Sequence, residues 1–237
     1  MCGRAYETYT DEELSFRYLQ RRAPVPFEIL PKYNLCPTQI SPVLRLFEGE
    51  RQFQPMHWQL IPEWEPVFKT SLSTINAKSE TIFKSSLYRD LVLRQRCIVP
   101  LSGFFEWKRD GKQRHPFKIY LSDEPIMSVA GIWAAWRPNT PDERLSFSIL
   151  TTSANEFMSK IHNRMPVILD RSDEDVWIDP ETQDEKLLQK ILKPCPDSWL
   201  AAVEVSPLVN SARNDGPEVL EPATDVSIAR TPLLFEL

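Results

Sequence analysis

Cys2 directly follows the initiator methionine, in the opening sequence Met1-Cys2-Gly3-Arg4. We expect Met1 to be removed because the residue after it is small, and removal leaves an α-amine beside the Cys2 thiol. Reference pKa values of about 8 for an α-amine and about 8.5 for a thiol bring both groups near neutral pH. Such a 1,2-aminothiol condenses with an aldehyde to an imine, and the thiol then adds to the same carbon and closes a five-membered thiazolidine. Cys2 is therefore a candidate nucleophile; the alternative is an ordinary chain-terminal residue.

Two further segments carry polar groups that suit such a reaction. Asn76 and Lys78 place an amide and an ammonium two residues apart, ahead of an expected helix. Glu106 lies in an aromatic strand, whose alternation places it on the face opposite to Phe105 and Trp107. Apolar surroundings tend to raise the pKa of a carboxylate, which suits proton transfer at neutral pH.

His162 is the best placed of the histidines because a cation, Arg164, follows it two residues later. For His57 and His115 we expect surface or packing roles. A lone histidine is more often structural than catalytic, so His162 gains a catalytic interpretation only together with the other polar groups.

Short helices and many strands must position these residues. Capping boxes predict three helices, opened by Thr10 with Glu13, Ser153 with Glu156, and Thr182 with Glu185. Strands are expected at residues 43–47, 52–60, 97–101, 103–108, 117–121, 126–133, 146–152, 167–169 and 200–205. Gly49 and Gly111 mark two hairpin turns. Because strands and helices do not alternate regularly, we expect an α+β fold, a single domain with a largely antiparallel, barrel-like β core flanked by short helices.

The chain has 237 residues, only 6 glycines against 21 prolines, and a net charge of −5. The charge is uneven: residues 84–118 contain nine basic side chains against three acidic ones, whereas residues 170–185 contain eight acids and one base. A nucleic-acid partner is therefore compatible with the acidic composition, because a local basic face can bind it.

Several classes of protein are excluded by missing motifs. The four cysteines form no C-x-x-C pair, so a zinc ribbon or a thioredoxin motif is not expected, and no dinucleotide, phosphate-loop or serine-hydrolase motif is present. We expect neither metal nor cofactor. Without a signal-peptide pattern or a membrane-length apolar run, we expect a cytoplasmic protein, nucleoid-associated if bacterial.

Taken in order, these segments resemble the SOS-response-associated peptidase (SRAP) family, whose members process abasic sites in single-stranded DNA. The matching motifs lie at residues 1–4, 33–34, 37–39, 58, 61–62, 64, 75–77, 80–81, 97–100, 103–108, 130–133, 151–152, 162–166, 209–210 and 214–217. They span residues 1 to about 222, so the resemblance implies one SRAP-like domain over residues 1–237, with a C-terminal tail after the motifs.

The resemblance implies a role for each candidate catalytic residue. Cys2 captures the ring-opened aldehyde of an abasic deoxyribose, and Asn76 orients the Cys2 amine. Glu106 moves protons during imine formation and its reversal. His162 helps to open the sugar ring and holds its hydroxyl group.

The resemblance also implies DNA contacts. Arg4, Lys78 and Arg164 bind phosphates that flank the lesion, although the family usually has arginine at the position of Lys78. Thr151 is a further expected DNA contact. Trp64 acts as an aromatic wedge against the stacked bases, with core packing as the alternative.

Three functions remain open from the sequence. The first is a monomeric sensor of abasic sites in single-stranded DNA that crosslinks to the lesion through Cys2 and shields it during the DNA damage response. Met1 is removed either by an autopeptidase activity of the protein or by an aminopeptidase. The second is a cysteine peptidase that uses Cys2 and His162 as a thiol–imidazole pair. The third is a DNA-binding module that forms no covalent bond.

Overall fold

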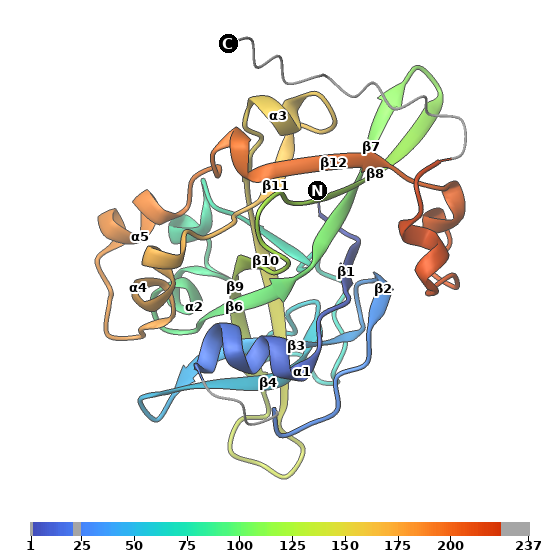
Figure 1. Cartoon of the computed structure of the whole chain (residues 1–237). Coiled ribbons are helices and arrows are strands. Elements are labelled where there is room, and N and C mark those ends of the chain that lie inside the picture. Colours follow the sequence, from blue (N-terminus) through green and yellow to red (C-terminus); the bar gives the residue numbers. More distant parts are fainter. Residues whose placement is uncertain (1, 21–24, 224–237) are drawn as a thin grey trace.

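Two β-sheets dominate the computed structural model, which describes residues 2–20 and 25–223 (Figure 1). The smaller sheet has the strand order β12 (Leu200–Glu204), β8 (Gln113–Leu121), β7 (Gly103–Asp110), β1 (Ala5–Glu7) and β2 (Lys32–Leu35). The larger sheet has the order β11 (Arg164–Pro166), β10 (Arg144–Ser153), β4 (Glu50–Trp58), β3 (Ile40–Phe47), β6 (Arg96–Leu101) and β9 (Met127–Trp136), with β5 (Asn76–Lys78) beside β10.

The larger sheet closes into a five-stranded barrel, because β10 pairs with β9 as well as with β4. Along the second half of β10, β5 and β11 take the places of β4 and β9. Only the pairings of β10 with β4 and β5 are parallel among the described strands. The expected α+β class with a largely antiparallel, barrel-like core is confirmed.

Both hairpins marked by glycines in the sequence are present. Glu48 and Gly49, with φ of 52° and 79°, connect β3 to β4, as a tight two-residue turn requires. Gly111, with φ of 56°, begins the turn between β7 and β8. The second strand of that hairpin starts at Gln113, earlier than expected, because Asp110 already pairs with Gln113.

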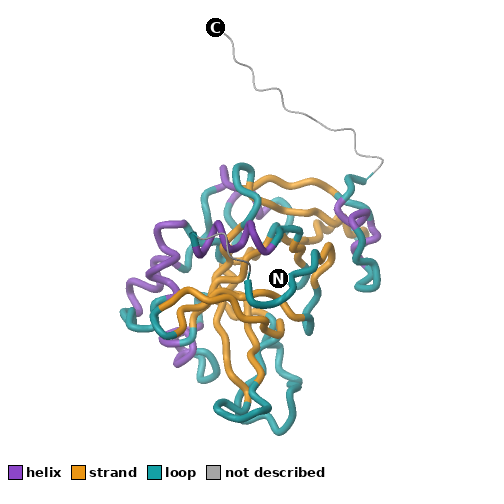
Figure 2. Tube along the Cα trace, turned by 60° about the horizontal axis from the view of Figure 1, so that its bottom comes forward, coloured by secondary structure: helices purple, strands orange, loops and turns teal. Residues whose placement is uncertain are grey.

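The helices are short and lie around the periphery of the strands (Figure 2). They are α1 (Asp11–Leu14), α2 (Arg89–Arg94), α3 (Glu156–Ser159), α4 (Glu174–Ile178) and α5 (Glu185–Ile191), and a π-helical turn, Ser15–Leu19, continues α1. Single 3-10 turns are formed by Ile82–Lys84, Arg171–Asp173, Asp197–Trp199, Pro207–Asn210 and Pro217–Leu220. The capping box of Thr10 and Glu13 is present at α1.

Two other predicted caps are wrong. Asn155 caps α3 in place of Ser153, because Ser153 is still paired in β10 and the Asn155 side chain accepts the Met158 N–H. Asp184 caps α5 in place of Thr182, whose hydroxyl donates to Asp179 instead.

Two predicted segments also differ. The helix expected after Lys78 is only the 3-10 turn Ile82–Lys84, because the residues before it are held as a strand against β10. The strand expected at residues 167–169 is a single bridge at Ile168, and the regular pairing lies just before it, in β11.

The barrel strands separate two apolar clusters by alternation. Leu44, Ile98 and Leu150 belong to the cluster that contains buried apolar side chains of α1, α2, α4 and α5. Val99 and Ile149 belong to the other cluster, which also contains Cys2 and Phe104 of the smaller sheet. The N-terminal cysteine is therefore packed between the barrel and the β1–β7 pair.

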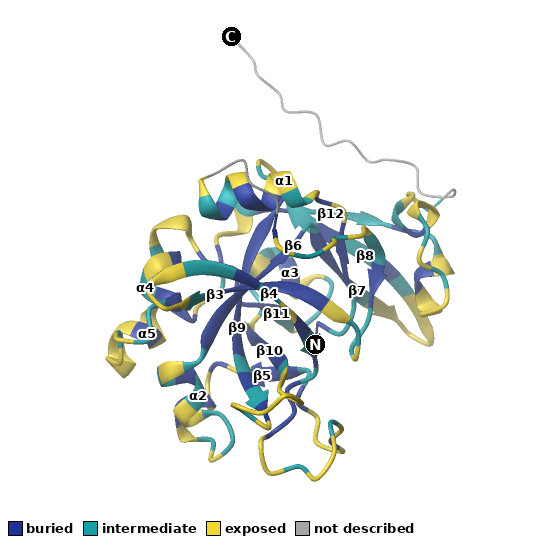
Figure 3. Cartoon of the chain, turned by 90° about the horizontal axis from the view of Figure 1, so that it is seen from below, coloured by how far each residue is buried: buried dark blue, intermediate teal, exposed yellow. Residues whose placement is uncertain are grey.

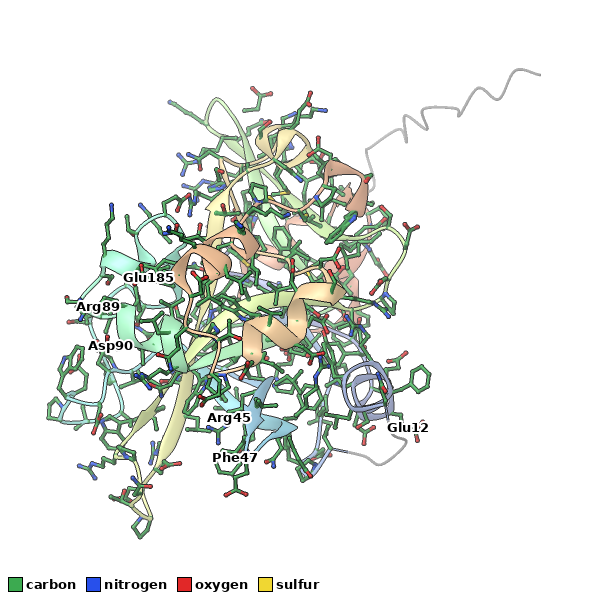
Figure 4. The ribbon with its side chains drawn as sticks, turned by 90° about the vertical axis from the view of Figure 1, so that its left-hand side faces the viewer. Glu12, Arg45, Phe47, Arg89, Asp90 and Glu185 are labelled. Atoms are coloured by element: carbon green, nitrogen blue, oxygen red, sulfur yellow. The ribbon has the colours of Figure 1, made fainter. Side chains whose placement is uncertain are left out.

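Arg45, near the end of β3, packs against two aromatic rings. The Arg45 guanidinium lies 4.5 Å from the centre of the Phe47 ring and 4.3 Å from that of Trp133 (Figure 4). The stack joins β3 to β9, which lie on either side of β6 in the barrel.

Candidate active site

The Cys2 side chain is fully buried. Burial, and to a smaller extent the negative charge of Glu106, raise the pKa of its thiol to about 12. The thiol is therefore protonated at neutral pH, and the Glu106 carboxylate is near enough to act on it electrostatically.

Strand pairing brings the N-terminus to Glu106. Ala5 pairs with Phe104, and the Phe105 N–H donates to the Arg4 carbonyl over 2.9 Å. Continuing this antiparallel register places Gly3 opposite Glu106. The pairing is close at Gly103, where a Cβ atom would collide with the Ile119 carbonyl oxygen and the Tyr6 hydroxyl.

Asn76 holds the Cys2 backbone. Its Nδ2 donates to the Cys2 carbonyl oxygen over 2.8 Å, and its side chain is nearly buried. The Oδ1 atom is also buried and accepts no hydrogen bond within the described residues. Asn76 is fixed by its pairing with Ile149 of β10 and by the Trp58 indole, which donates to the Ile75 carbonyl over 3.0 Å.

Glu106 and His162 form a pair at the edge of this buried region. The His162 Nδ1 lies 4.0 Å from the Glu106 Oε1, and the side chains are 28% and 5% exposed, respectively. A turn after α3 places His162, whose backbone N–H donates to the Met158 carbonyl over 2.8 Å. The Arg164 backbone N–H donates to His162 Nδ1 over 3.0 Å, and the Arg164 carbonyl oxygen lies 3.2 Å from the same atom, so the Arg164 backbone fixes the orientation of the imidazole.

The Arg164 guanidinium lies between β10 and the carboxylate of Glu80. Its guanidinium donates to the Thr151 carbonyl over 2.7 Å and to the Thr151 hydroxyl over 3.2 Å. It also forms a two-point contact with Glu80, and these hydrogen bonds lower the pKa of the Glu80 carboxyl. Thr151 is fully buried, so its visible role is to position Arg164.

Arg4 and Lys78 follow Cys2 and Asn76, respectively, by two residues in the chain. The Arg4 guanidinium donates to Asn34 Oδ1 over 2.9 Å and to the Val209 carbonyl over 2.7 Å. Lys78 is exposed, pairs through its backbone with Thr151, and forms no ion pair within the described residues. Its ammonium group is therefore available for a ligand.

Trp64 lies in the connection between β4 and β5. It is 68% exposed, which excludes the alternative of core packing. The next residue, Glu65, accepts a hydrogen bond from the Trp136 indole, and Trp136 pairs with Arg144 at the start of β10. At about 3.3 Å per residue, this point is roughly 20 Å along the strand from Thr151.

Asn34 and Glu80 make contacts at the site that the sequence did not predict, although both residues lie in the matching motifs. Asn34 is fully buried and ties the C-terminal segment to the site: its side chain donates to the carbonyls of Ser211 and Asn214, and its N–H donates to Asp215. The available signal was an asparagine in the motif at residues 33–34 together with Asn214 and Asp215 in the motif at residues 214–217. For Glu80 the signal was a carboxylate two residues after Lys78, in a segment otherwise assigned to phosphate binding.

Within residues 2–20 and 25–223, no group of three or more His, Cys, Asp or Glu side chains is placed to hold a metal ion. No helix in the same residues has the length and apolar character that crossing a membrane requires.

The chain is similar to known proteins in both sequence and fold. Residues 1–212 match the family described as SOS response associated peptidase (SRAP). The abasic site processing protein YoqW of Bacillus subtilis is 36% identical over 197 residues, which cover 82% of this chain and 87% of that protein. The abasic site processing protein HMCES of Gallus gallus is 33% identical over 225 residues, covering 81% of this chain and 66% of that protein. A crystal structure of a Bacteroides thetaiotaomicron protein has a TM-score of 0.81 and 28% identity, and covers 94% of this chain and 100% of that one. The chain therefore belongs to the SOS response associated peptidase family.

Proposed function

We propose that this chain processes abasic sites in single-stranded DNA and crosslinks to them through Cys2 after removal of Met1. The observation that carries the proposal is the Cys2 backbone, held over 2.8 Å by Asn76 beside the Glu106–His162 pair. The names of the relatives, abasic site processing proteins, support the same substrate.

The first step is attack of the Cys2 amine on C1′ of the ring-opened sugar. The aldehyde oxygen leaves as water, and a C1′=N imine forms. Because the pKa of the Cys2 thiol is raised to about 12, the thiol remains protonated and does not compete as a thiolate at neutral pH. The amine is therefore the first nucleophile.

In the second step the Cys2 sulfur adds to C1′ and closes the thiazolidine. The thiol proton must leave and the imine nitrogen must gain one, so the step needs a group that accepts and then returns a proton. Glu106 lies within electrostatic range of the thiol and fits this role. The same carboxylate returns the proton to sulfur when the ring opens, which makes the crosslink reversible.

Asn76 and His162 prepare the two reactants. The Asn76 Nδ2 fixes the Cys2 carbonyl, and its Oδ1, which has no partner within the described residues, is suited to accept an N–H of the amine. His162 is the more exposed member of its pair and faces the entering sugar. Ring opening moves a proton from the C1′ hydroxyl to O4′, and we assign that transfer to His162.

The cations hold the DNA. Arg4, Lys78 and Arg164 bind phosphates, and Thr151 contributes by orienting Arg164. Glu80 must share Arg164 with the phosphate, because it already forms two hydrogen bonds with that guanidinium. Trp64, which is 68% exposed, stacks against a nucleobase.

The test is a denaturing gel of the Met1-processed protein with single-stranded DNA that carries one abasic site. Wild type gives a heat-stable band of lower mobility. Cys2→Ala and Cys2→Ser both keep the amine but have no thiol to close the thiazolidine, so each gives a band only after borohydride reduction. A heat-stable band from Cys2→Ala contradicts the proposal.

Two other functions remain distinguishable. A peptidase that uses Cys2 and His162 would turn over unrelated peptides, and the intact masses of wild type and Glu106→Ala from one expression host reveal whether Met1 removal depends on this site. A module that binds DNA without a covalent bond would keep its full affinity in Cys2→Ala and form no crosslink. We assign the chain as a monomer, which sedimentation with and without DNA tests.

A further inference from the structure

A cluster of cations occupies the end of the β7–β8 hairpin. Lys108, Arg109, Lys112 and Arg114 lie within seven consecutive residues, and Asp110 is the acid among them. All four cationic side chains are exposed, and the end of the hairpin extends from the body of the protein (Figure 3). We call these four residues the basic arm. It stands out in a chain whose net charge is −5.

The basic arm does not stabilise the fold. Arg109 pairs directly with Arg114 across the hairpin, and like charges at opposite positions destabilise strand pairing. Within the described residues, the four side chains make no hydrogen bond and no ion pair. Their positive charge is therefore uncompensated by the protein, which is the condition for binding an anionic partner.

The hairpin begins at the candidate active site. Glu106 lies on β7, two residues before Lys108, and the Arg4 guanidinium lies 6.0 Å from the ring of Trp107 on the same strand. From Glu106 to the tip is about 13 Å at about 3.3 Å per residue. Because single-stranded DNA can extend beyond the roughly 3.4 Å per nucleotide of a B-form strand, that length corresponds to at most about four nucleotides.

We propose that the basic arm binds the phosphate backbone of the DNA that flanks the abasic site, within about four nucleotides of it. This inference rests on the proposed function, since it takes the lesion to lie at Cys2 and Glu106. The contacts are to phosphates and carry no base preference, because exposed arginine and lysine side chains read charge rather than sequence here. Continuity with Arg4 and Trp107 favours DNA over an acidic protein or a lipid surface.

The test measures binding of undamaged single-stranded DNA as a function of salt. For Arg109→Gln/Arg114→Gln, we expect the slope of log K against log salt to fall by about 1.4, which is about 0.7 for each of two phosphates. Arg109→Lys/Arg114→Lys keeps the charges and keeps the slope. Lys186→Gln/Lys190→Gln, which removes two exposed cations on α5, is the matched control and leaves the slope unchanged.

Oligonucleotide length localises the contact. Wild type binds an oligonucleotide of about 20 nucleotides with a steeper salt slope than one of about 3 nucleotides, and Arg109→Gln/Arg114→Gln loses most of that difference. A slope equal to that of wild type in this variant, or an equal loss in the α5 control, overturns the proposal. Loss of slope only with an acidic peptide or anionic vesicles, and not with DNA, also overturns it.

The two proposals fail separately. If wild type forms no crosslink while the arm variant still loses salt dependence, the proposed chemistry is wrong and the arm remains a DNA-binding element. If wild type forms the crosslink and the arm variant binds with an unchanged slope, the arm proposal alone is wrong.

Discussion

Asn76→Ala tests how the structure positions the nucleophile. The substitution removes the 2.8 Å hydrogen bond from Nδ2 to the Cys2 carbonyl, in a place where Asn76 is 8% exposed and Cys2 is fully buried. The Cys2 carbonyl is then left without this donor in a buried site. Leaving a buried polar group unsatisfied costs about 1–3 kcal/mol.

That cost sets the expected change in rate. The Cys2 backbone loses its fixed position, and a cost of about 1–3 kcal/mol corresponds to a decrease of about 5- to 150-fold in the rate of crosslinking. Asn76→Asp also removes the donor, so it decreases the rate as well.

The assay is single-turnover crosslinking with protein in excess over abasic DNA, followed on a denaturing gel. Thermal unfolding of each variant separates a loss of positioning from a loss of the fold. Gln189→Ala truncates an exposed amide on α5 and is the matched control, with the rate of wild type. A folded Asn76→Ala variant with the rate of wild type refutes the reasoning.

Three further predictions concern the surroundings of the site. Glu80→Gln removes the charge that competes with DNA for Arg164, so we expect single-stranded DNA to bind about 1.5- to 5-fold more tightly. Glu181→Gln is the surface control. Weaker binding by Glu80→Gln would be inconsistent with competition. Gly103→Val forces a side chain against the Ile119 carbonyl and Tyr6, so both the melting temperature and the crosslink yield fall. The control Gly49→Asn, at an open turn with positive φ, changes neither. An unchanged yield in Gly103→Val argues against a tight β1–β7 contact. The pKa of the Cys2 thiol is about 12 in the folded chain and about 8.5 in the unfolded chain, so the contribution of the thiol to stability is complete below about pH 8.5 and is lost as pH rises toward 12. Above about pH 8.5, the melting temperature of Cys2→Ala therefore falls less than that of wild type. Equal decreases in the two proteins would contradict the burial of the thiol.

Local signals in the sequence were sufficient for the hairpins and for α1. The turns at Gly49 and Gly111 depend on backbone conformations that glycine adopts easily, and the Thr10 capping box involves residues three positions apart. Such features are readable because the interacting groups are neighbours in the chain.

Features that depend on distant pairing could not be read in the same way. Asn76 lies in a strand because β10, more than 70 residues later, offers it a free edge, and nothing in its own segment specifies that partner. Barrel closure through the pairing of β4 with β10 is equally non-local, since Ser146 pairs with His57. Ser153 resembled a helix cap from its neighbours alone, but its pairing with Arg164 keeps it in a strand.

The candidate site was predicted in part. The resemblance identified Cys2, Asn76, Glu106 and His162, and the fold brings Asn76 to Cys2 and His162 to Glu106. The ion pair of Arg164 with Glu80 and the burial of Thr151 could not be predicted, because both arise where β10, β11 and the turn after β5 meet.

The most direct test of the central claim is the mass of the N-terminal tryptic peptide after crosslinking and nuclease digestion. Cleavage after Arg4 releases Cys2-Gly3-Arg4, so an adduct on Cys2 is separated from one on any lysine. We predict that this peptide lacks Met1 and carries the sugar adduct less one water, without borohydride reduction. An adduct found instead on Lys78, or one that requires reduction to survive, would contradict the thiazolidine mechanism.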